Sequence, residues 1–158
     1  MNKRLRETIE RIKKELSKEP SLIMIGKIND GFDKKSKNLS NKTYCDFLDV
    51  CNGARCGIVD LWSNENIKNN QYRVTDLVGG SDKWVCIGQI LYEPLVFSLD
   101  DENVYLFYQE HESEMQGRCF GEFDSFLLNY IFGKQYKELV PDVVDDEWYS
   151  FLKGLNLF

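Results

Sequence analysis

The sequence contains one histidine, His111, in 158 residues. Catalysis by a Ser-His or Cys-His pair would have to use this side chain. His111 lies in the very polar stretch 109–114, where neighbouring carboxylates favour the protonated imidazole and make it a weak base near neutral pH. The glycines also lack the spacing of a phosphate-binding or dinucleotide-binding loop. We therefore expect that the protein is not an enzyme and needs no cofactor.

Long apolar runs and paired cysteine motifs are missing as well. No run approaches the roughly 18 apolar residues of a membrane helix, and no apolar segment follows the basic N-terminus. The five cysteines are odd in number and form no Cys-x-x-Cys motif. Although Cys45, Cys51 and Cys56 are close in sequence, they lack the ligand spacing of a zinc site. We expect reduced thiols, no bound metal and a cytoplasmic location without membrane attachment.

Positive charge is scarce beyond residue 42. Residues 1–42 contain twelve Lys or Arg and six Asp or Glu, whereas the remainder contains eight and twenty. An acidic surface disfavours nucleic acid, whose phosphates attract positive charge, and it accelerates encounter with a basic protein. We therefore expect a protein partner. A surface that serves solubility alone is the alternative, and nucleic-acid binding by the basic first segment is a third hypothesis.

Apolar residues repeat at helical spacing in four segments, which predicts four helices. Ser40 or Asn41 is expected to cap the second helix, and Gly53 supplies the left-handed residue that follows it. Asp145 or Asp146 is expected to cap the last helix. The predicted helices span about residues 3–18, 41–52, 123–131 and 148–155.

Short apolar runs between these helices predict the strands of a sheet. The turn at 100–103 has the composition of a hairpin connection. Residues 63–83 are rich in Asn, Asp, Gly and Ser, which predicts a long surface loop that can pair as an edge strand at 72–77. Loops are also expected at 29–38 and 110–117. The predicted strands cover residues 21–28, 57–62, 84–90, 95–99 and 104–108.

Consecutive strands flanked by helices indicate one α+β domain over residues 1–158. The expected architecture is a largely antiparallel mixed sheet flanked by N-terminal and C-terminal helices. Apolar stripes on these elements must meet in one core. The residues expected to be buried together are Phe47, Leu48, Trp84, Ile87, Phe123, Phe126 and Leu127.

Four segments resemble the SUKH superfamily, which includes the yeast Smi/Knr cell-wall regulators and many bacterial toxin-immunity proteins. The first is the helix and turn Tyr44–Gly53, and the second is the aromatic strand Trp84–Gly88. The third is the hairpin Leu95–Tyr108 with its acidic turn, and the fourth is the segment Phe120–Leu128. Their order and spacing carry the resemblance, although Leu39-Ser40 stands where the family usually has Leu-Pro.

The resemblance implies an α+β domain that acts by binding another protein and not by catalysis. In bacteria, such proteins typically neutralise a co-encoded toxin, often a nuclease. The expected function is therefore that of an immunity protein, with a basic toxin domain as partner. The alternative is a regulatory or scaffolding module of the Smi/Knr type without a toxin partner. No pattern in the sequence indicates an oligomeric state.

Trp62 is the first candidate for an apolar contact with the partner, because it ends a predicted strand and begins the long polar stretch. Acidic side chains near it and in the two acidic turns would attract a basic protein. The residues expected to contact the partner are Trp62, Asp60, Glu65, Asp100, Asp101, Glu102, Glu110 and Glu112.

Overall fold

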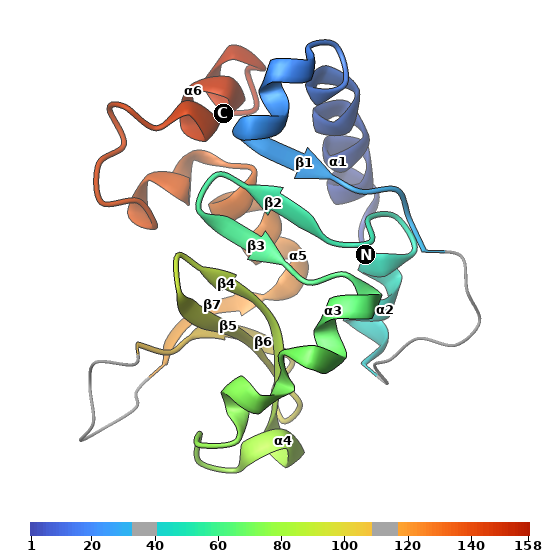
Figure 1. Cartoon of the computed structure of the whole chain (residues 1–158), viewed down its shortest axis with the longest axis vertical. Coiled ribbons are helices and arrows are strands. Elements are labelled where there is room, and N and C mark those ends of the chain that lie inside the picture. Colours follow the sequence, from blue (N-terminus) through green and yellow to red (C-terminus); the bar gives the residue numbers. More distant parts are fainter. Residues whose placement is uncertain (33–40, 109–116) are drawn as a thin grey trace.

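A computed structural model describes residues 1–32, 41–108 and 117–158 of the chain (Figure 1). Its strands follow one another in sequence order across a single seven-stranded sheet, and every neighbouring pair is antiparallel. The α+β class is confirmed, and the sheet is antiparallel throughout rather than mixed. The strands are β1 Gly26–Ile28, β2 Ala54–Cys56, β3 Val59–Leu61, β4 Trp84–Ile90, β5 Glu93–Ser98, β6 Asn103–Leu106 and β7 Arg118–Glu122.

The helices differ widely in length. The longest, α1, has fourteen residues, and α3, α4 and α5 make one or two turns each. The α-helices are α1 Lys3–Leu16, α2 Lys42–Leu48, α3 Asn64–Asn69, α4 Gly80–Lys83, α5 Phe123–Phe126 and α6 Glu147–Gly154. Further helical turns are η1 Pro20–Met24, η2 Gln71–Val74, η3 Leu127–Ile131 and η4 Lys134–Glu138.

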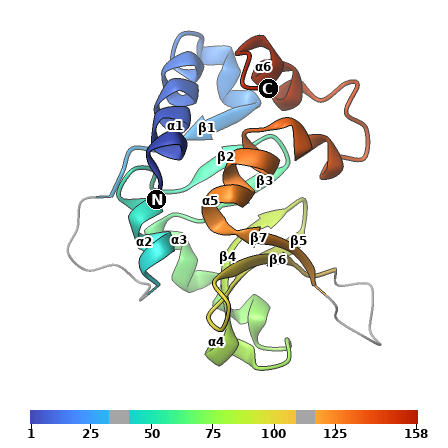
Figure 2. The same ribbon diagram turned by 180° about the vertical axis from the view of Figure 1, so that it is seen from behind.

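One face of the sheet carries the main hydrophobic core. Helices α1, α2, α5 and α6 pack on this face, and α1 and α5 lie in front of the sheet in Figure 2. The apolar stripe of α1 is fully buried there, with Leu5, Ile9 and Ile12 at 0–1% exposure. Burying these stripes stabilises the fold by about 25 cal/mol for each Å² of apolar surface removed from water. We call this face of the sheet the covered face.

The predicted helices on the covered face are confirmed, and their caps explain where they begin. The Asn41 side chain accepts a hydrogen bond of 2.9 Å from the backbone N–H of Tyr44, so Asn41 and not Ser40 caps α2. Asp146 caps α6 in the same way, at 2.7 Å from the N–H of Tyr149. The second helix ends earlier than predicted, at Leu48, and Gly53 has the expected positive φ of 82°.

The strands predicted at 57–62, 84–90, 95–99 and 104–108 are confirmed as β3, β4, β5 and β6, although the boundaries of all but β4 differ by one or more residues. The predicted strand at 21–28 is a 3₁₀ turn over Pro20–Met24 followed by the short strand β1. Strands β2 and β7 were not predicted from the sequence. The two-residue turn between β2 and β3 begins at Gly57, whose positive φ of 58° suits a tight hairpin.

The segment 63–83 forms α3, η2 and α4 joined by turns and does not pair as a strand, so the predicted edge strand at 72–77 was wrong. Val74 at the end of η2 and Leu77 in the turn after it pack against the sheet face opposite the covered face. Trp84 also points to that side, into a second cluster with Cys86, Val96 and Phe107. The expectation that Trp84 shares one core with Phe47 and Phe126 was therefore wrong, while the other six residues are buried together.

Candidate functional site

The sheet face opposite the covered face is only partly covered, and we call it the open face. The helical segment 64–83 and the second cluster cover it over β4, β5 and β6. Strand register places a row of side chains across the first five strands of this face: Lys27, Arg55, Asp60, Gln89 and Pro94. Four of the five are polar. Successive side chains of a strand point to opposite faces, so the apolar neighbours of these residues point to the covered face. We call this row the polar row.

Segment 64–83 is held on the sheet by a side chain that forms hydrogen bonds with backbone groups of β4, as a neighbouring strand would. The Gln71 amide donates to the Cys86 carbonyl at 2.9 Å and accepts from the Cys86 N–H at 3.0 Å. These backbone groups of β4 lie beyond the end of β3, which pairs only with Gly88, Gln89 and Ile90. The Trp84 indole adds a hydrogen bond of 2.9 Å to the carbonyl of Val78. Together these bonds fix η2 above the sheet.

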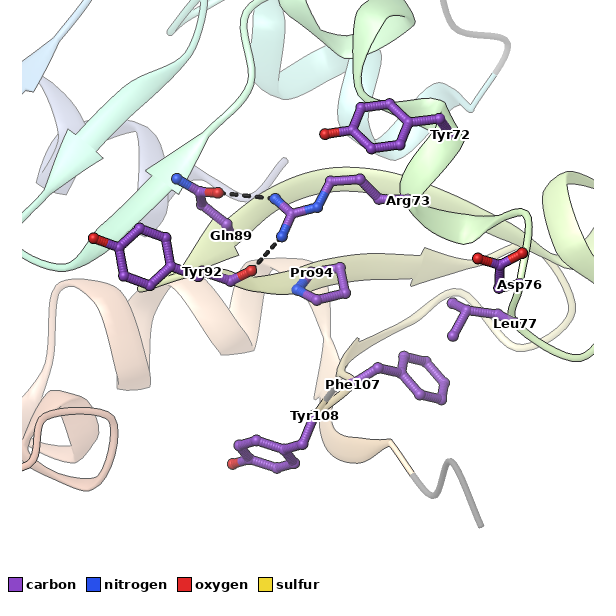
Figure 3. Close-up of a pocket in the computed structure, with 9 residues that line it drawn as sticks. All are labelled: Tyr72, Arg73, Asp76, Leu77, Gln89, Tyr92, Pro94, Phe107 and Tyr108. Atoms are coloured by element: carbon purple, nitrogen blue, oxygen red, sulfur yellow. Dashed lines mark hydrogen bonds between the residues drawn. The ribbon is translucent and has the colours of Figure 1, made fainter. Parts of the chain in front are cut away.

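A groove of about 640 Å³ lies between η2 and the sheet at one end of the polar row (Figure 3). Tyr72, Tyr92 and Tyr108 are its exposed tyrosines, at 69%, 83% and 41%. They come from η2, the β4–β5 turn and the end of β6, three segments that only the fold brings together. We call it the tyrosine groove. Its lining residues are Tyr72, Arg73, Asp76, Leu77, Gln89, Tyr92, Pro94, Phe107 and Tyr108.

Arg73 crosses the tyrosine groove and is fixed at both ends of its guanidinium group. Its Nη1 donates to Oε1 of Gln89 at 2.8 Å, and its Nη2 donates to the carbonyl of Tyr92. The Gln89 amide in turn donates to Oδ2 of Asp60 at 2.8 Å. The Gln89 amide thus links the guanidinium group of Arg73 on η2 to the carboxylate of Asp60 on β3.

A second hollow of about 450 Å³ lies at the other end of the polar row. Lys27, Arg55 and Asp60 line it together with residues of η1, β2, β3 and the start of α3. Arg55 is tied down by a hydrogen bond of 2.6 Å to the carbonyl of Ile23. Asp60 and Gln89 therefore separate two hollows on the same face, one rich in tyrosine and one rich in basic groups.

The residues predicted to contact a partner do not form one site. Asp60 is half-buried and lies in the polar row on β3. Trp62 is half-buried, packs against both hydrophobic clusters, and its carbonyl accepts a hydrogen bond of 2.7 Å from the Tyr44 hydroxyl. Its buried Nε1 has no hydrogen-bond partner among the described residues. Trp62 is thus largely part of the packing that joins the two faces.

The predicted acidic residues lie in three places. Glu65 is exposed on α3, where it accepts a hydrogen bond of 3.1 Å from Asn52. The hairpin residues Asp101 and Glu102 line a different hollow, beside Met1 and Asp124. Asp100 of the same hairpin lies 3.6 Å from the Lys83 ammonium group. Glu110 and Glu112 lie outside the described residues.

The buried thiols are poorly suited to nucleophilic chemistry. Burial raises the pKa of Cys51 to about 12 and raises that of Cys56 well above its usual value. A thiol is nucleophilic as the thiolate, which these values keep scarce near neutral pH. Within residues 1–32, 41–108 and 117–158, no group of three His, Cys, Asp or Glu residues is arranged to hold a metal ion. His111 lies outside the described residues.

The tyrosine groove is the part of the open face best suited to contact another protein. Tyrosine and arginine side chains are enriched at the energetic centres of protein interfaces, and here both line one hollow. Sequence reasoning missed the groove because its residues are scattered over 72–108. No helix in the described part of the chain is long and apolar enough to span a bilayer. Comparisons with known protein families and with curated proteins find no match.

Proposed function

We propose that this chain is a non-catalytic protein-binding domain, and that it acts as an immunity protein by neutralising a cognate bacterial toxin. The observation that carries the binding function is the tyrosine groove, a preformed hollow lined by three exposed tyrosines and a fixed arginine. Rigid aromatic side chains supply large contact areas at low entropic cost. The resemblance to the SUKH superfamily supports the choice of a toxin as partner.

The charge distribution supports a basic partner. Beyond residue 42, Asp and Glu outnumber Lys and Arg by twenty to eight. Such an excess raises the rate of encounter with a positively charged protein and lowers that with nucleic acid. In the basic first helix and just after it, Lys3, Lys13 and Lys18 form ion pairs with Glu7, Asp30 and Glu15. These pairs reduce the field that the helix would offer to phosphates, and a cytoplasmic location belongs to the same proposal.

The alternative function is that of a regulatory or scaffolding module of the Smi/Knr type. It uses the same groove and the same acidic surface, and it differs in the identity of the partner. The two functions therefore cannot be separated by the fold, because a fold supports many functions. They are separated by whether a toxin is encoded beside the gene and whether this chain blocks it.

The deciding experiment is a growth assay in a bacterial host. The toxin domain encoded beside the gene is expressed with and without this chain, and a catalytically inactive toxin variant serves as the control for expression burden. The immunity function predicts that the chain restores growth and forms a complex with the purified toxin domain. A gene neighbourhood without a toxin, or a toxin that this chain does not block, would assign the regulatory function instead.

A further inference from the structure

The charges of the tyrosine groove are not equally available to a ligand. Arg73 donates to Gln89 and to the Tyr92 carbonyl, and Gln89 donates to Asp60. The positive charge of Arg73 is thereby linked to the negative charge of Asp60 through a single amide. A ligand that approached Arg73 would have to replace hydrogen bonds that are already made.

Asp76 lies at the opposite end of the same groove, away from the Arg73 guanidinium (Figure 3). It is exposed, and its carboxylate forms no hydrogen bond or ion pair with any residue in the described ranges. With Arg73 and Asp60 linked to each other, Asp76 is the charge of this groove that is open to a ligand. Its sign is negative, so complementarity calls for a cation.

The other walls of the groove suit a cation with an apolar stem. Tyr72 and Tyr108 present exposed rings, and Pro94, Leu77 and Phe107 form an apolar floor. A guanidinium or ammonium group is attracted to the face of a tyrosine ring, and the aliphatic part of its side chain packs on apolar surface. The volume of about 640 Å³ exceeds one side chain and leaves room for its neighbours.

From this geometry we propose that the tyrosine groove is the docking site for an arginine or lysine side chain on a surface loop of the protein partner, with Asp76 as its ionic acceptor. The aromatic rings contact the stem of that side chain and the residues that flank it. This inference rests on the proposed binding function and names the part of the surface that performs it. It also places recognition away from Trp62 and from the acidic hairpin at 100–102.

The first test measures affinity for the cognate toxin domain by calorimetry. Asp76→Asn is expected to weaken binding roughly 10-fold, and Tyr72→Ala roughly 10- to 100-fold. The matched control is Asp82→Asn, which removes the same charge from an exposed position on α4 outside the groove lining. It is expected to change affinity by less than about twofold. Thermal unfolding checks that all three variants fold like the parent protein.

The second test needs no toxin and therefore fails or succeeds independently of the immunity function. The acetylated and amidated peptide Gly-Leu-Arg-Leu-Gly is titrated at millimolar concentration against isotope-labelled protein, and backbone amide shifts are followed by NMR. Two further peptides replace the arginine by citrulline, which is isosteric and neutral, or by glutamate. The arginine peptide is expected to shift the amides of Arg73, Asp76 and Tyr92, and Asp76→Asn is expected to abolish most of that shift.

The outcomes separate the candidates for the occupant. Equal shifts with citrulline would assign the groove to an uncharged ligand, and stronger shifts with glutamate would assign it to an acidic one. Shifts confined to the hairpin at 100–102, or no shift at all, would remove the groove from recognition. Each of these results would overturn the inference. If the toxin is neutralised but Asp76→Asn leaves its affinity unchanged, the proposed function stands and the docking site lies elsewhere.

Discussion

The two faces of the sheet are built from the same strands but are stabilised in different ways. The covered face buries side chains from α1, α2, α5 and α6 in one large cluster. The open face has a smaller cluster, and it relies on Gln71, Arg73 and Trp84 to hold segment 64–83 by hydrogen bonds. Apolar burial is insensitive to small displacements, whereas hydrogen-bonded docking requires defined geometry. The open face therefore positions polar side chains at little cost to the core.

The largest loss of stability is expected from truncation on the covered face. Phe126 is fully buried against Phe120 and Tyr130, with ring centroids at 5.0 and 6.0 Å. Phe126→Ala leaves a cavity and should lower the free energy of unfolding by about 3–5 kcal/mol, measured by urea denaturation. The control on the open face is Tyr92→Ala, which should change the free energy of unfolding by less than about 0.5 kcal/mol. Similar losses for both variants would contradict the contrast between the faces.

The next largest effect is expected at the turn between β2 and β3. Gly57 has a φ of +58°, and a Cβ built on it would lie 2.1 Å from the Tyr136 hydroxyl. That hydroxyl also accepts a hydrogen bond of 3.1 Å from the N–H of Ile58. Gly57→Ala should therefore lower the free energy of unfolding by about 2–4 kcal/mol, through backbone strain and displacement of Tyr136.

The matched control for the turn is Gly154→Ala at the end of α6. A Cβ at Gly154 meets no atom within 4 Å, and this residue has no positive φ. The substitution should raise the free energy of unfolding by up to about 1 kcal/mol, because alanine favours helix over glycine. Thermal denaturation compares the stability of the two variants. If Gly57→Ala leaves the stability unchanged, the turn tolerates a side chain.

A smaller and more local effect is expected where segment 64–83 docks on the open face. Gln71→Ala leaves the N–H and carbonyl of Cys86 without their partner, which should cost about 1–3 kcal/mol. Hydrogen exchange should show faster exchange of the Cys86 amide while the amides of α1 keep their protection. Asn70→Ala, on the same segment, removes a side-chain hydrogen bond to the Asn66 carbonyl and should leave the Cys86 amide unchanged. Unchanged exchange in the Gln71 variant would show that other contacts hold the segment.

The covered face could largely be predicted from the sequence, since its helices carry apolar residues at helical spacing and three of them, α1, α2 and α6, begin at Asn or Asp caps. Strands β2 and β7 were missed for a physical reason. A three-residue strand shows too little alternation to be recognised, and β7 was hidden by the helical stripe that follows it at Phe123. Pairing with neighbours, and not local preference, makes these segments extended.

Segment 64–83 and the tyrosine groove could not be derived in the same way. The high content of Asn, Asp, Gly and Ser conceals a helical spacing at Ile67, Val74 and Leu77, which was the available signal for these turns. The sequence offered Asp60 as a candidate only for its charge, whereas its link to Gln89 and Arg73 depends on strand register and on η2. Because tertiary packing brings the residues of the groove together, no local sequence pattern predicts it.

The smallest effect is expected at the solvent-exposed end of the open face. The Tyr105 hydroxyl donates to Oδ2 of Asp101 at 2.6 Å and thereby lowers the pKa of that carboxyl. A lowered pKa in the folded state stabilises the protein above the unfolded-state pKa of about 3.9, and this contribution disappears as the pH falls through the lower folded value. Tyr105→Phe should therefore lower the free energy of unfolding by no more than about 1 kcal/mol at pH 7, because both groups face water. Urea denaturation at pH 7 and at pH 3 should show the difference shrinking at the lower pH. A difference that stays the same on acidification would mean that the Tyr105 hydroxyl does not act through the Asp101 carboxylate, since the ring that packs on Trp84 is kept in the variant.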